Sequence, residues 1–374
     1  MRKLTLNPVL HVLGWAAMSV LLTACQSHTE TYGGDRAVSS PNPQQKEKAA
    51  MATTARADGN MKAVLTELKS LGGKPIETLS AEEAREQPTP ADAVKALLKA
   101  QGKSAAPEPV GKIENANIAG PGGSIPIRIY SPNGDGPFPV IVYYHGGGWV
   151  IATIDTYDAS PRALSNAAKA VVVAVEYRKG PEHKFPAAHE DAYIAYAWVL
   201  ANADKINGDH RRIAVAGESA GGNLAAGVAL MAKKMGKRMP VHQVLVYPVT
   251  GYDFNTPSYQ ENANAKPLNK AMMPWFFEKY LKTPADAESP FISLVRAKDL
   301  EGLPPATIIT AEIDPLRSDG RQYADRLKET GVPVNYKNYE GVTHEFFGMT
   351  AVLDEAKAAV KQAAGDLTKA FTRS

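Results

Sequence analysis

IAVAGESAGGNLAA, residues 213–226, runs from a short apolar strand through small residues into an alanine-rich helix. A serine at the apex of so tight a turn sits in strained backbone, and Gly217 and Gly221 stand where a Cβ would collide with a neighbouring strand or helix. The pattern therefore predicts a nucleophile elbow that lifts the Ser219 hydroxyl out of a sheet. At the start of the helix, the Ala220 N–H and the positive helix end would lie beside any oxyanion formed there.

A second glycine-rich stretch supports this interpretation, since the elbow pattern by itself also arises by chance. Residues 140–144 form an apolar strand that leads directly into HGGGW at 145–149. Three glycines leave backbone N–H groups uncovered and able to turn toward a ligand, which is what the second half of an oxyanion hole requires. The alternative, a merely flexible glycine loop, is disfavoured by the elbow downstream.

The rest of the chain alternates between strand-like and helix-like stretches. Apolar spacing and capping signals predict helices before the sheet, at 61–71, from Ser80 onward and at 91–100. Strands are expected at about 113–118, 125–130, 139–144, 171–176, 212–216, 243–247, 306–311 and 333–339, with helices such as 158–169, 187–202 and 222–235 between them. This alternation predicts an α/β fold with a mostly parallel, doubly wound sheet.

Residues 251–288 interrupt the alternation between two strands. They carry a group of aromatic side chains: Tyr252, Phe254, Trp275, Phe276, Phe277 and Tyr280. We expect this segment to be an insertion that folds over the site. Phe276, Phe277 and Tyr280, with Trp149 beside the glycines, are candidates for contact with a substrate. The alternative is that each of them only fills the core of the insertion, because half-buried aromatic residues are common packing residues.

A nucleophilic serine needs a base to take its proton, and the base needs an acid to orient it. Sites in such sheets lie at the carboxyl ends of the strands. Of the eight histidines, His344 follows the last predicted strand and falls at that edge. Asp314 and Glu312 both lie near the end of another strand, and Pro315 places Asp314 just beyond the sheet, so we prefer Asp314 as the acid. The chain order Ser219, Asp314, His344 is that of the α/β-hydrolases.

The composition suits a globular protein and the N-terminus suits an exported one. The chain has 374 residues, of which 44% are hydrophobic, and a net charge of +3, too small to indicate a nucleic-acid partner. Arg2 and Lys3 precede an apolar run from about Val9 to Leu22. This pattern predicts a secretory signal peptide, since the run is shorter than the ~20 apolar residues of a membrane span.

Cys25 is the only cysteine of the chain, so no intrachain disulfide is possible. LTAC at residues 22–25 resembles the bacterial lipobox, in which the cysteine is lipid-modified and becomes the first residue of the mature protein. The resemblance implies a lipoprotein signal peptide over 1–24, and Gln26 at the next position favours the outer membrane. Residues 25–60 hold almost no large apolar groups and predict a disordered tether, which leaves 61–374 as the folded domain.

From about Pro75 to the C-terminus the chain resembles the hormone-sensitive-lipase-like carboxylesterases, a branch of the α/β-hydrolases. The motifs that carry the resemblance are HGGGW at 145–149, Tyr177-Arg178, Pro181-Glu182-His183, FPAA at 185–188, Glu190-Asp191-Ala192, GESAGG at 217–222, DPLR at 314–317 and His344. Together they are highly specific. Lys179-Gly180 stands where the family usually has Leu-Ala, and Glu218 replaces a commoner Asp, but neither departure removes a catalytic group.

The resemblance implies an eight-stranded sheet and a helical cap built from about 61–105 and 251–288. It also implies hydrolysis of short- to medium-chain esters through an acyl-enzyme, with an oxyanion hole from the amides of Gly147, Gly148 and Ala220. A small-molecule ester would be the substrate, and a lipid on Cys25 would attach the exported protein to the membrane.

Two other functions remain compatible with this pattern of residues. One is a catalytically inactive relative that binds a small ligand in the same pocket, and the other is a thioesterase or peptidase that uses the same triad. The sequence contains no metal-ligand cluster and no phosphate-binding glycine loop, so we expect neither a metal nor an organic cofactor.

Overall fold

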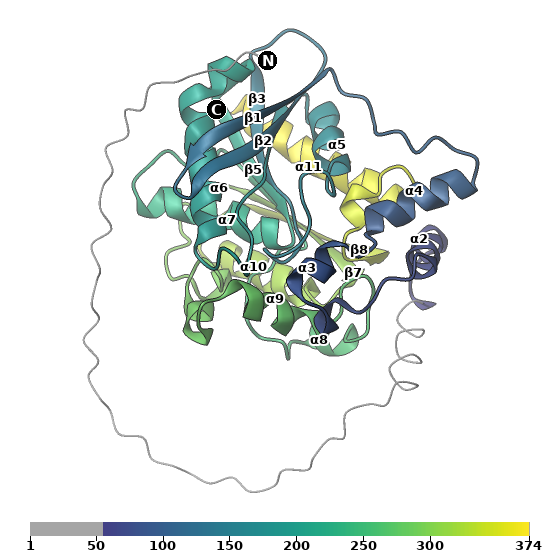
Figure 1. Ribbon diagram of the computed structural model, residues 1–374. Helices are drawn as coiled ribbons and strands as arrows, with labels where there is room; N and C mark the ends of the chain where they lie inside the picture. Colours follow the sequence, from purple (N-terminus) through teal and green to yellow (C-terminus); the bar gives the residue numbers. More distant parts are fainter. Residues whose placement is uncertain (1–54, 374) are drawn as a thin grey trace, which may run out of the picture. The chain divides into compact units, whose positions relative to one another are not determined.

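The computed structural model describes residues 55–373, and its centre is one eight-stranded sheet (Figure 1). The strands are β1 (Lys112–Gly120), β2 (Gly123–Ser131), β3 (Phe138–Tyr144), β4 (Val171–Val175), β5 (Gly208–Glu218), β6 (Gln243–Val246), β7 (Ala306–Ile313) and β8 (Val334–Thr343). Their order is β1-β2-β4-β3-β5-β6-β7-β8. β2 runs antiparallel to both of its neighbours, and all other pairs are parallel. The predicted fold class is therefore confirmed.

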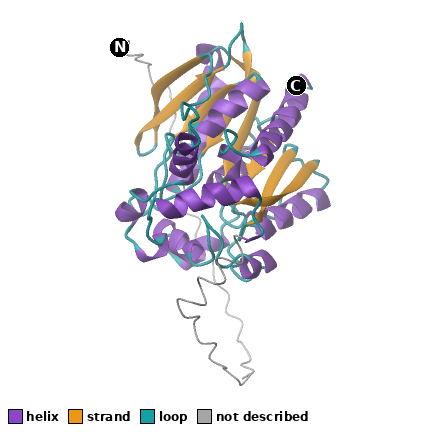
Figure 2. Ribbon diagram, turned by 90° about the vertical axis from the view of Figure 1, so that its right-hand side faces the viewer, coloured by secondary structure: helices purple, strands orange, loops and turns teal. Residues whose placement is uncertain are grey.

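Helices cover both faces of this sheet (Figure 2). Side chains alternate along each strand, so Val140 and Val142 pack on one face of β3 while Ile141 and Tyr143 pack on the other. The first face contacts α6 (Ala187–Asn202), α7 (Ala220–Lys234) and α10 (Arg317–Glu329). The second contacts α5 (Ala159–Ala168) and α11 (Asp354–Thr372). Because both faces are covered, a central strand such as β4 reads as an unbroken apolar run, VVVAV.

The N-terminal helices fall into two groups. α2 (Gly59–Ser70) packs against α4 (Pro90–Ala100) and touches β8. By contrast, η1 (Ile76–Thr78) and α3 (Ala81–Arg85) lie toward the aromatic insertion, where the indole N–H of Trp275 donates to the carbonyl of Leu79 at 3.0 Å. The second group thus contacts the aromatic helix of the segment that we expected to fold over the site.

The insertion forms α8 (Pro257–Glu261), α9 (Met272–Tyr280) and η3 (Pro284–Glu288), followed by η4 (Leu294–Arg296). The hydrophobic residues of α9 are almost all buried, because the helix lies between the body of the domain and η1. The short helices η2 (Ala203–Ile206) and η5 (Phe346–Gly348) complete the described secondary structure. Within residues 55–373, no helix is both long enough and apolar enough to cross a membrane.

The helix predicted at 61–71 begins earlier than the spacing of apolar residues indicated. α2 starts at Gly59 rather than at Met61, because the Asp58 side chain accepts a hydrogen bond from the Met61 N–H and caps the helix. Ala57 is buried, so the last residues of the predicted tether pack on the domain. The predicted signal peptide, Cys25 and the rest of the predicted tether lie outside the described residues.

Candidate active site

The elbow is built between β5 and α7. Ser219 has φ 56° and ψ −119°, a conformation that L-residues adopt only under constraint. A Cβ on Gly217 would lie 2.1 Å from the Gly221 carbonyl oxygen, and one on Gly221 would lie 2.0 Å from the carbonyl oxygen of Tyr144. Larger residues at these two positions would therefore force the turn apart. The strained turn leaves Ser219 at the carboxyl edge of the sheet, as its sequence pattern predicted.

The glycine loop after β3 lies at the same edge. Gly147 and Gly148 have φ angles of 89° and 57°, which glycine adopts without steric cost. Among the described residues, neither Gly147 nor Gly148 uses its backbone N–H in a hydrogen bond. Ala220 is the first residue of α7, where N–H groups have no partner within the helix. The three amides proposed from the family resemblance are thus available to a ligand.

Two side chains hold the glycine loop from behind. The Tyr177 hydroxyl lies 2.9 Å from the carbonyl oxygen of His145 and 3.0 Å from that of Gly146, so it can donate to either. The rings of Tyr177 and His145 stack with centroids 4.4 Å apart, and burial lowers the pKa of His145 to about 4, so this imidazole is neutral at pH 7. Arg85 donates to the carbonyl of Val150 at 2.9 Å. Sequence reasoning quoted Tyr177 only as a family motif and assigned it no role.

Asp314 and His344 are joined directly. His344 Nδ1 lies 2.7 Å from Asp314 Oδ2, and both side chains are buried. The other oxygen of Asp314 accepts the backbone N–H of Leu316 at 2.9 Å, which fixes the carboxylate. The Glu312 carboxylate instead accepts the backbone N–H of Gly341 at 2.8 Å. Of the two candidate acids, the structure places Asp314 on the histidine.

The electrostatic surroundings of His344 favour its protonated form. Burial by itself lowers the pKa of this imidazole, but Asp314, Glu345 and Glu218 together raise it above the ordinary value. No hydrogen bond joins Ser219 to His344 within the described residues. Tyr247 lies beside both segments. Its ring centroid is 4.4 Å from that of His344, and its hydroxyl donates to Glu218, the residue before Ser219.

The buried Glu218 and the partly buried Glu345 form a carboxyl cluster that sequence reasoning missed. The Tyr143 hydroxyl donates to Glu218 at 2.5 Å, and the Tyr157 hydroxyl donates to Glu345 at 2.5 Å. Burial, with a smaller contribution from Glu345, raises the pKa of Glu218 to about 7. Burial also raises the pKa of Glu345.

Glu345 adopts φ 72°, and its carboxylate lies 3.8 Å from His344 Nε2. The imidazole therefore has a carboxyl group near each of its nitrogens, Asp314 at Nδ1 and Glu345 at Nε2. The available signal was position alone, because Glu218 and Glu345 each adjoin a predicted catalytic residue in the sequence.

The aromatic candidates of the insertion divide between the glycine loop and the core. A Cβ on Gly148 would lie 2.2 Å from Cδ1 of Phe276, so the Phe276 ring lies directly against a predicted oxyanion glycine. Trp149 is fully buried and packs on Tyr280 and Phe277, with ring centroids 4.9 and 5.5 Å away. The Tyr280 hydroxyl hydrogen-bonds to His189 Nδ1 at 2.9 Å. The Phe276 ring thus lies against the glycine loop, whereas Tyr280 and Phe277 pack on Trp149.

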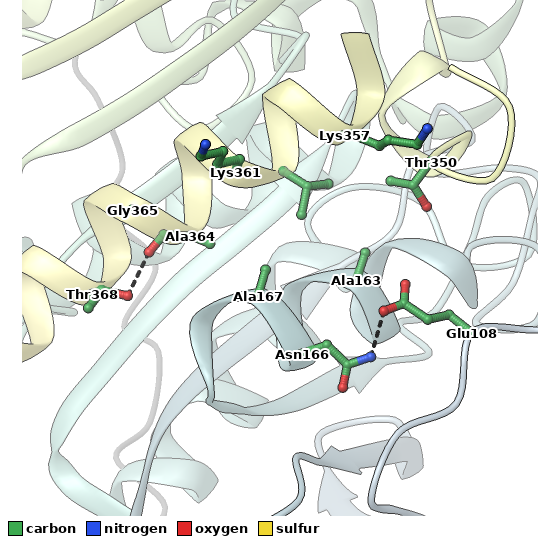
Figure 3. A pocket seen from close by; sticks show the side chains of 11 residues that line it. Glu108, Ala163, Asn166, Ala167, Thr350, Lys357, Lys361, Ala364, Gly365 and Thr368 are labelled. Carbon is green, nitrogen blue, oxygen red and sulfur yellow. Dashed lines mark hydrogen bonds between the residues drawn. The ribbon is translucent and has the colours of Figure 1, made fainter. Parts of the chain in front are cut away.

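Two surface grooves lie away from these residues. One runs between α5 and α11, where the Asn166 side chain donates to Glu108 at 2.6 Å (Figure 3). The other lies at the amino-terminal end of β6, β7 and β8, beside His242. None of the predicted site residues lines either groove.

The geometry defines a site for nucleophilic chemistry at a carbonyl carbon. A strained serine, an imidazole bonded to a buried carboxylate and unpaired backbone amides meet at one edge of the sheet. A family described as having the alpha/beta hydrolase fold matches residues 141–348. The chain belongs to this family.

Its relatives include esterases from bacteria and archaea. Carboxylesterase NlhH of Mycobacterium tuberculosis is 41% identical over 251 residues, covering 66% of this chain and 79% of that protein. Esterase LipI of the same species is 40% identical over 257 residues, covering 67% and 80%. A solved structure of the hyperthermophilic esterase from Pyrobaculum calidifontis is 42% identical with a TM-score of 0.73, covering 81% of this chain and 96% of that one.

Proposed function

We propose that the protein is a serine carboxylesterase that hydrolyses short- to medium-chain carboxylic esters through an acyl-enzyme. The observation that carries this proposal is the 2.7 Å contact between Asp314 and His344 at the same sheet edge as the strained Ser219. The similarity to carboxylesterase NlhH and esterase LipI supports the ester as the substrate class.

In the proposed reaction, Ser219 Oγ attacks the ester carbonyl carbon and passes its proton to His344. Nε2 is the nitrogen that takes the proton, because Nδ1 is held by Asp314. The amides of Gly147, Gly148 and Ala220 donate to the oxyanion of the tetrahedral intermediate. His344 then gives the proton to the departing alcohol, and a water molecule repeats the sequence on the acyl-enzyme.

A fluorophosphonate probe tests the proposal together with hydrolysis of p-nitrophenyl butyrate. The wild-type protein should be labelled on Ser219 and should hydrolyse the ester, and Ser219→Ala should lose both properties. Unlabelled wild-type protein would favour the inactive ligand-binding relative. Faster turnover of an acyl-thioester or an aminopeptide than of the matched oxygen ester would favour the thioesterase or peptidase.

We further propose that the enzyme is exported and anchored by a lipid on Cys25 to the bacterial outer membrane, on its periplasmic side. The lipobox-like LTAC at 22–25 and the lack of any other cysteine support this proposal. Mass spectrometry of protein expressed in a Gram-negative host should find a lipid on Cys25. Cys25→Ser should be unacylated and soluble with its esterase activity intact, and a wild-type Cys25 without lipid would refute the anchor.

A further inference from the structure

Asp314 and His344 lie on two separate loops whose spacing must be maintained for the pair to stay in contact. We call residues 312–316 the acid loop and residues 341–345 the histidine loop. Besides the Asp314–His344 contact, the two are joined by the pairing of Ile313 with Thr343 at the ends of β7 and β8 and by a hydrogen bond from the Gly341 N–H to the Glu312 carboxylate at 2.8 Å. Further support comes from a segment almost three hundred residues away, residues 55–61, which we call the N-terminal strap.

The strap lies tightly against the histidine loop. The Asp58 N–H donates to the carbonyl of Gly341 at 2.9 Å. Gly341 has φ 70°, and a Cβ there would lie 3.2 Å from the Cβ of Asp58, so the two backbones are in close contact. Met61 is fully buried, and the Thr343 hydroxyl lies 3.5 Å from its sulfur. These contacts reach within one residue of His344.

The strap also reaches the acid loop, through one side chain of the insertion. The Arg56 guanidinium donates to the side-chain oxygen of Asn262 and pairs with Glu261 at 2.5 Å. The Asn262 amide in turn donates to the backbone carbonyl of Asp314 at 3.1 Å and to that of Glu312 at 3.3 Å. Arg56 thereby fixes the orientation of the amide that holds the backbone of the acid itself. Its guanidinium also lies 3.8 Å from the Glu312 carboxylate.

We propose that the N-terminal strap is a positioning segment for catalysis, which holds the acid and histidine loops at the spacing that the Asp314–His344 hydrogen bond requires. This inference rests on the roles proposed above for Asp314 and His344. Within residues 55–373, the strap forms no hydrogen bond or ion pair with Ser219, the glycine loop or the aromatic residues of α9. Its loss should therefore lower kcat and leave KM nearly unchanged, because no group that meets the substrate is removed.

Arg56→Ala in the full chain is the first test. We expect kcat for p-nitrophenyl butyrate to fall about tenfold with KM within about twofold of wild type, since a displaced orienting group misplaces the base. The acid limb of kcat/KM should move to lower pH. Asp314, Glu345 and Glu218 raise the pKa of His344, with Tyr247 packed on the ring, and a looser Asp314 contact removes part of that effect.

Arg56→Lys and Arg296→Ala complete this test. A lysine keeps the charge beside Glu261 but lacks the fork that also reaches Asn262, so Arg56→Lys should recover only part of kcat. Arg296→Ala removes an exposed arginine that pairs with Glu288 and contacts neither loop, so it should match wild type.

A pair of substitutions at Asp58 isolates one hydrogen bond. Asp58 has φ −65°, the value that proline imposes, so Asp58→Pro removes the N–H that donates to Gly341. Asp58→Ala removes the same helix-capping side chain and keeps the N–H. A lower kcat in Asp58→Pro than in Asp58→Ala therefore measures the effect of the Asp58–Gly341 backbone hydrogen bond by itself.

The proposal is overturned if the Arg56 and Asp58 variants melt earlier but keep wild-type kcat and the wild-type pH profile well below their melting temperatures. That result would make the strap a purely structural element. A rise in KM at constant kcat would also overturn it, because the strap would then act through the substrate pocket. If the wild-type enzyme hydrolyses no ester, the proposed function fails instead, so the two failures are distinguishable.

Discussion

The elbow and the cap-like insertion meet at one site, but they are held in different ways. Around Ser219 the constraints are backbone contacts, in which Gly217 and Gly221 leave no room for any Cβ. In the insertion the constraints are side-chain contacts between distant segments, such as Trp275 with Leu79 and Tyr280 with His189. A backbone contact accepts one residue type, whereas a packed aromatic cluster tolerates several. Changes at the elbow edge should therefore affect chemistry, and changes in the insertion should affect substrate choice or stability.

The largest effect should come from the acid at the catalytic edge. Asp314→Asn should lower kcat about 10⁴-fold, because the amide no longer holds the tautomer of His344 that accepts the serine proton. Glu312→Gln should cost only a few-fold, since Glu312 accepts the Gly341 N–H and does not touch the imidazole. Steady-state kinetics on p-nitrophenyl butyrate checks the ranking, and the reverse order would reassign the acid.

The next effect tests the contact between the two regions. Gly148→Ala should lower kcat about 10²- to 10³-fold, the range for loss of one oxyanion donor, because the new Cβ would strike Phe276 and displace the loop. Gly236→Ala is the matched control, since Gly236 has a similar φ of 60° with nothing within 4 Å of a Cβ. Adding Phe276→Ala should recover part of kcat. If the double variant is no better than Gly148→Ala, strain rather than the clash accounts for the loss.

A smaller change in substrate choice is expected within the insertion. Each buried CH₂ contributes ~0.8 kcal/mol, so kcat/KM should rise with acyl length, peak near butyrate to hexanoate and fall for long-chain, emulsified lipids. Phe276→Ala should shift the peak toward longer acyl groups, because Phe276 lies against Gly148.

Tyr280→Ala and Phe277→Ala should mainly lower the melting temperature, since both rings are buried against Trp149. The measurement is a chain-length series of p-nitrophenyl esters for each variant. If none of the three variants shifts the peak, the aromatic cluster is structural.

The smallest effect concerns the pH dependence of stability at Glu218. Its pKa is raised from 4.5 to about 7 by burial, so between these pH values the folded state keeps a proton that the unfolded state has lost. Raising the pH therefore favours unfolding, by at most about 1.4 kcal/mol per pH unit for this one group. Glu218→Gln should remove that slope from denaturant unfolding measured between pH 4.5 and 7. The control variant Glu340→Gln, at an exposed position, should keep the wild-type slope. Equal slopes in wild type and Glu218→Gln would show that Glu218 is ionised throughout this pH range.

Much of the sheet and of its catalytic edge could be predicted because local patterns carry the constraints. β3, β5 and β7 were recognisable as apolar runs that end in glycine or acid motifs, and His344 was the histidine that followed the last strand. The preference for Asp314 over Glu312 used only the position of Pro315. In each case a steric rule or the strand direction acts within a few residues of the chain.

The carboxyl cluster and the strap could not be predicted, since they depend on which side chains meet across the fold. No spacing rule brings Tyr143 to Glu218 or Tyr157 to Glu345. By composition, residues 55–60 belong to a polar tether. Their packing, with Ala57 buried and Arg56 bonded to Asn262, depends on distant segments that a local pattern does not reveal.

The sequence by itself determined the α/β fold, the strained serine turn and the candidate triad, because glycine requirements and strand–helix alternation are local properties of the chain. Only the tertiary structure decided that Phe276 lies on Gly148, that Trp149 is buried with Tyr280, and that Arg56 supports the loop of Asp314. The contacts of Phe276, Trp149 and Arg56 join residues from about 130 to more than 200 positions apart, and side-chain packing over such separations is specified by the whole folded core rather than by any one stretch.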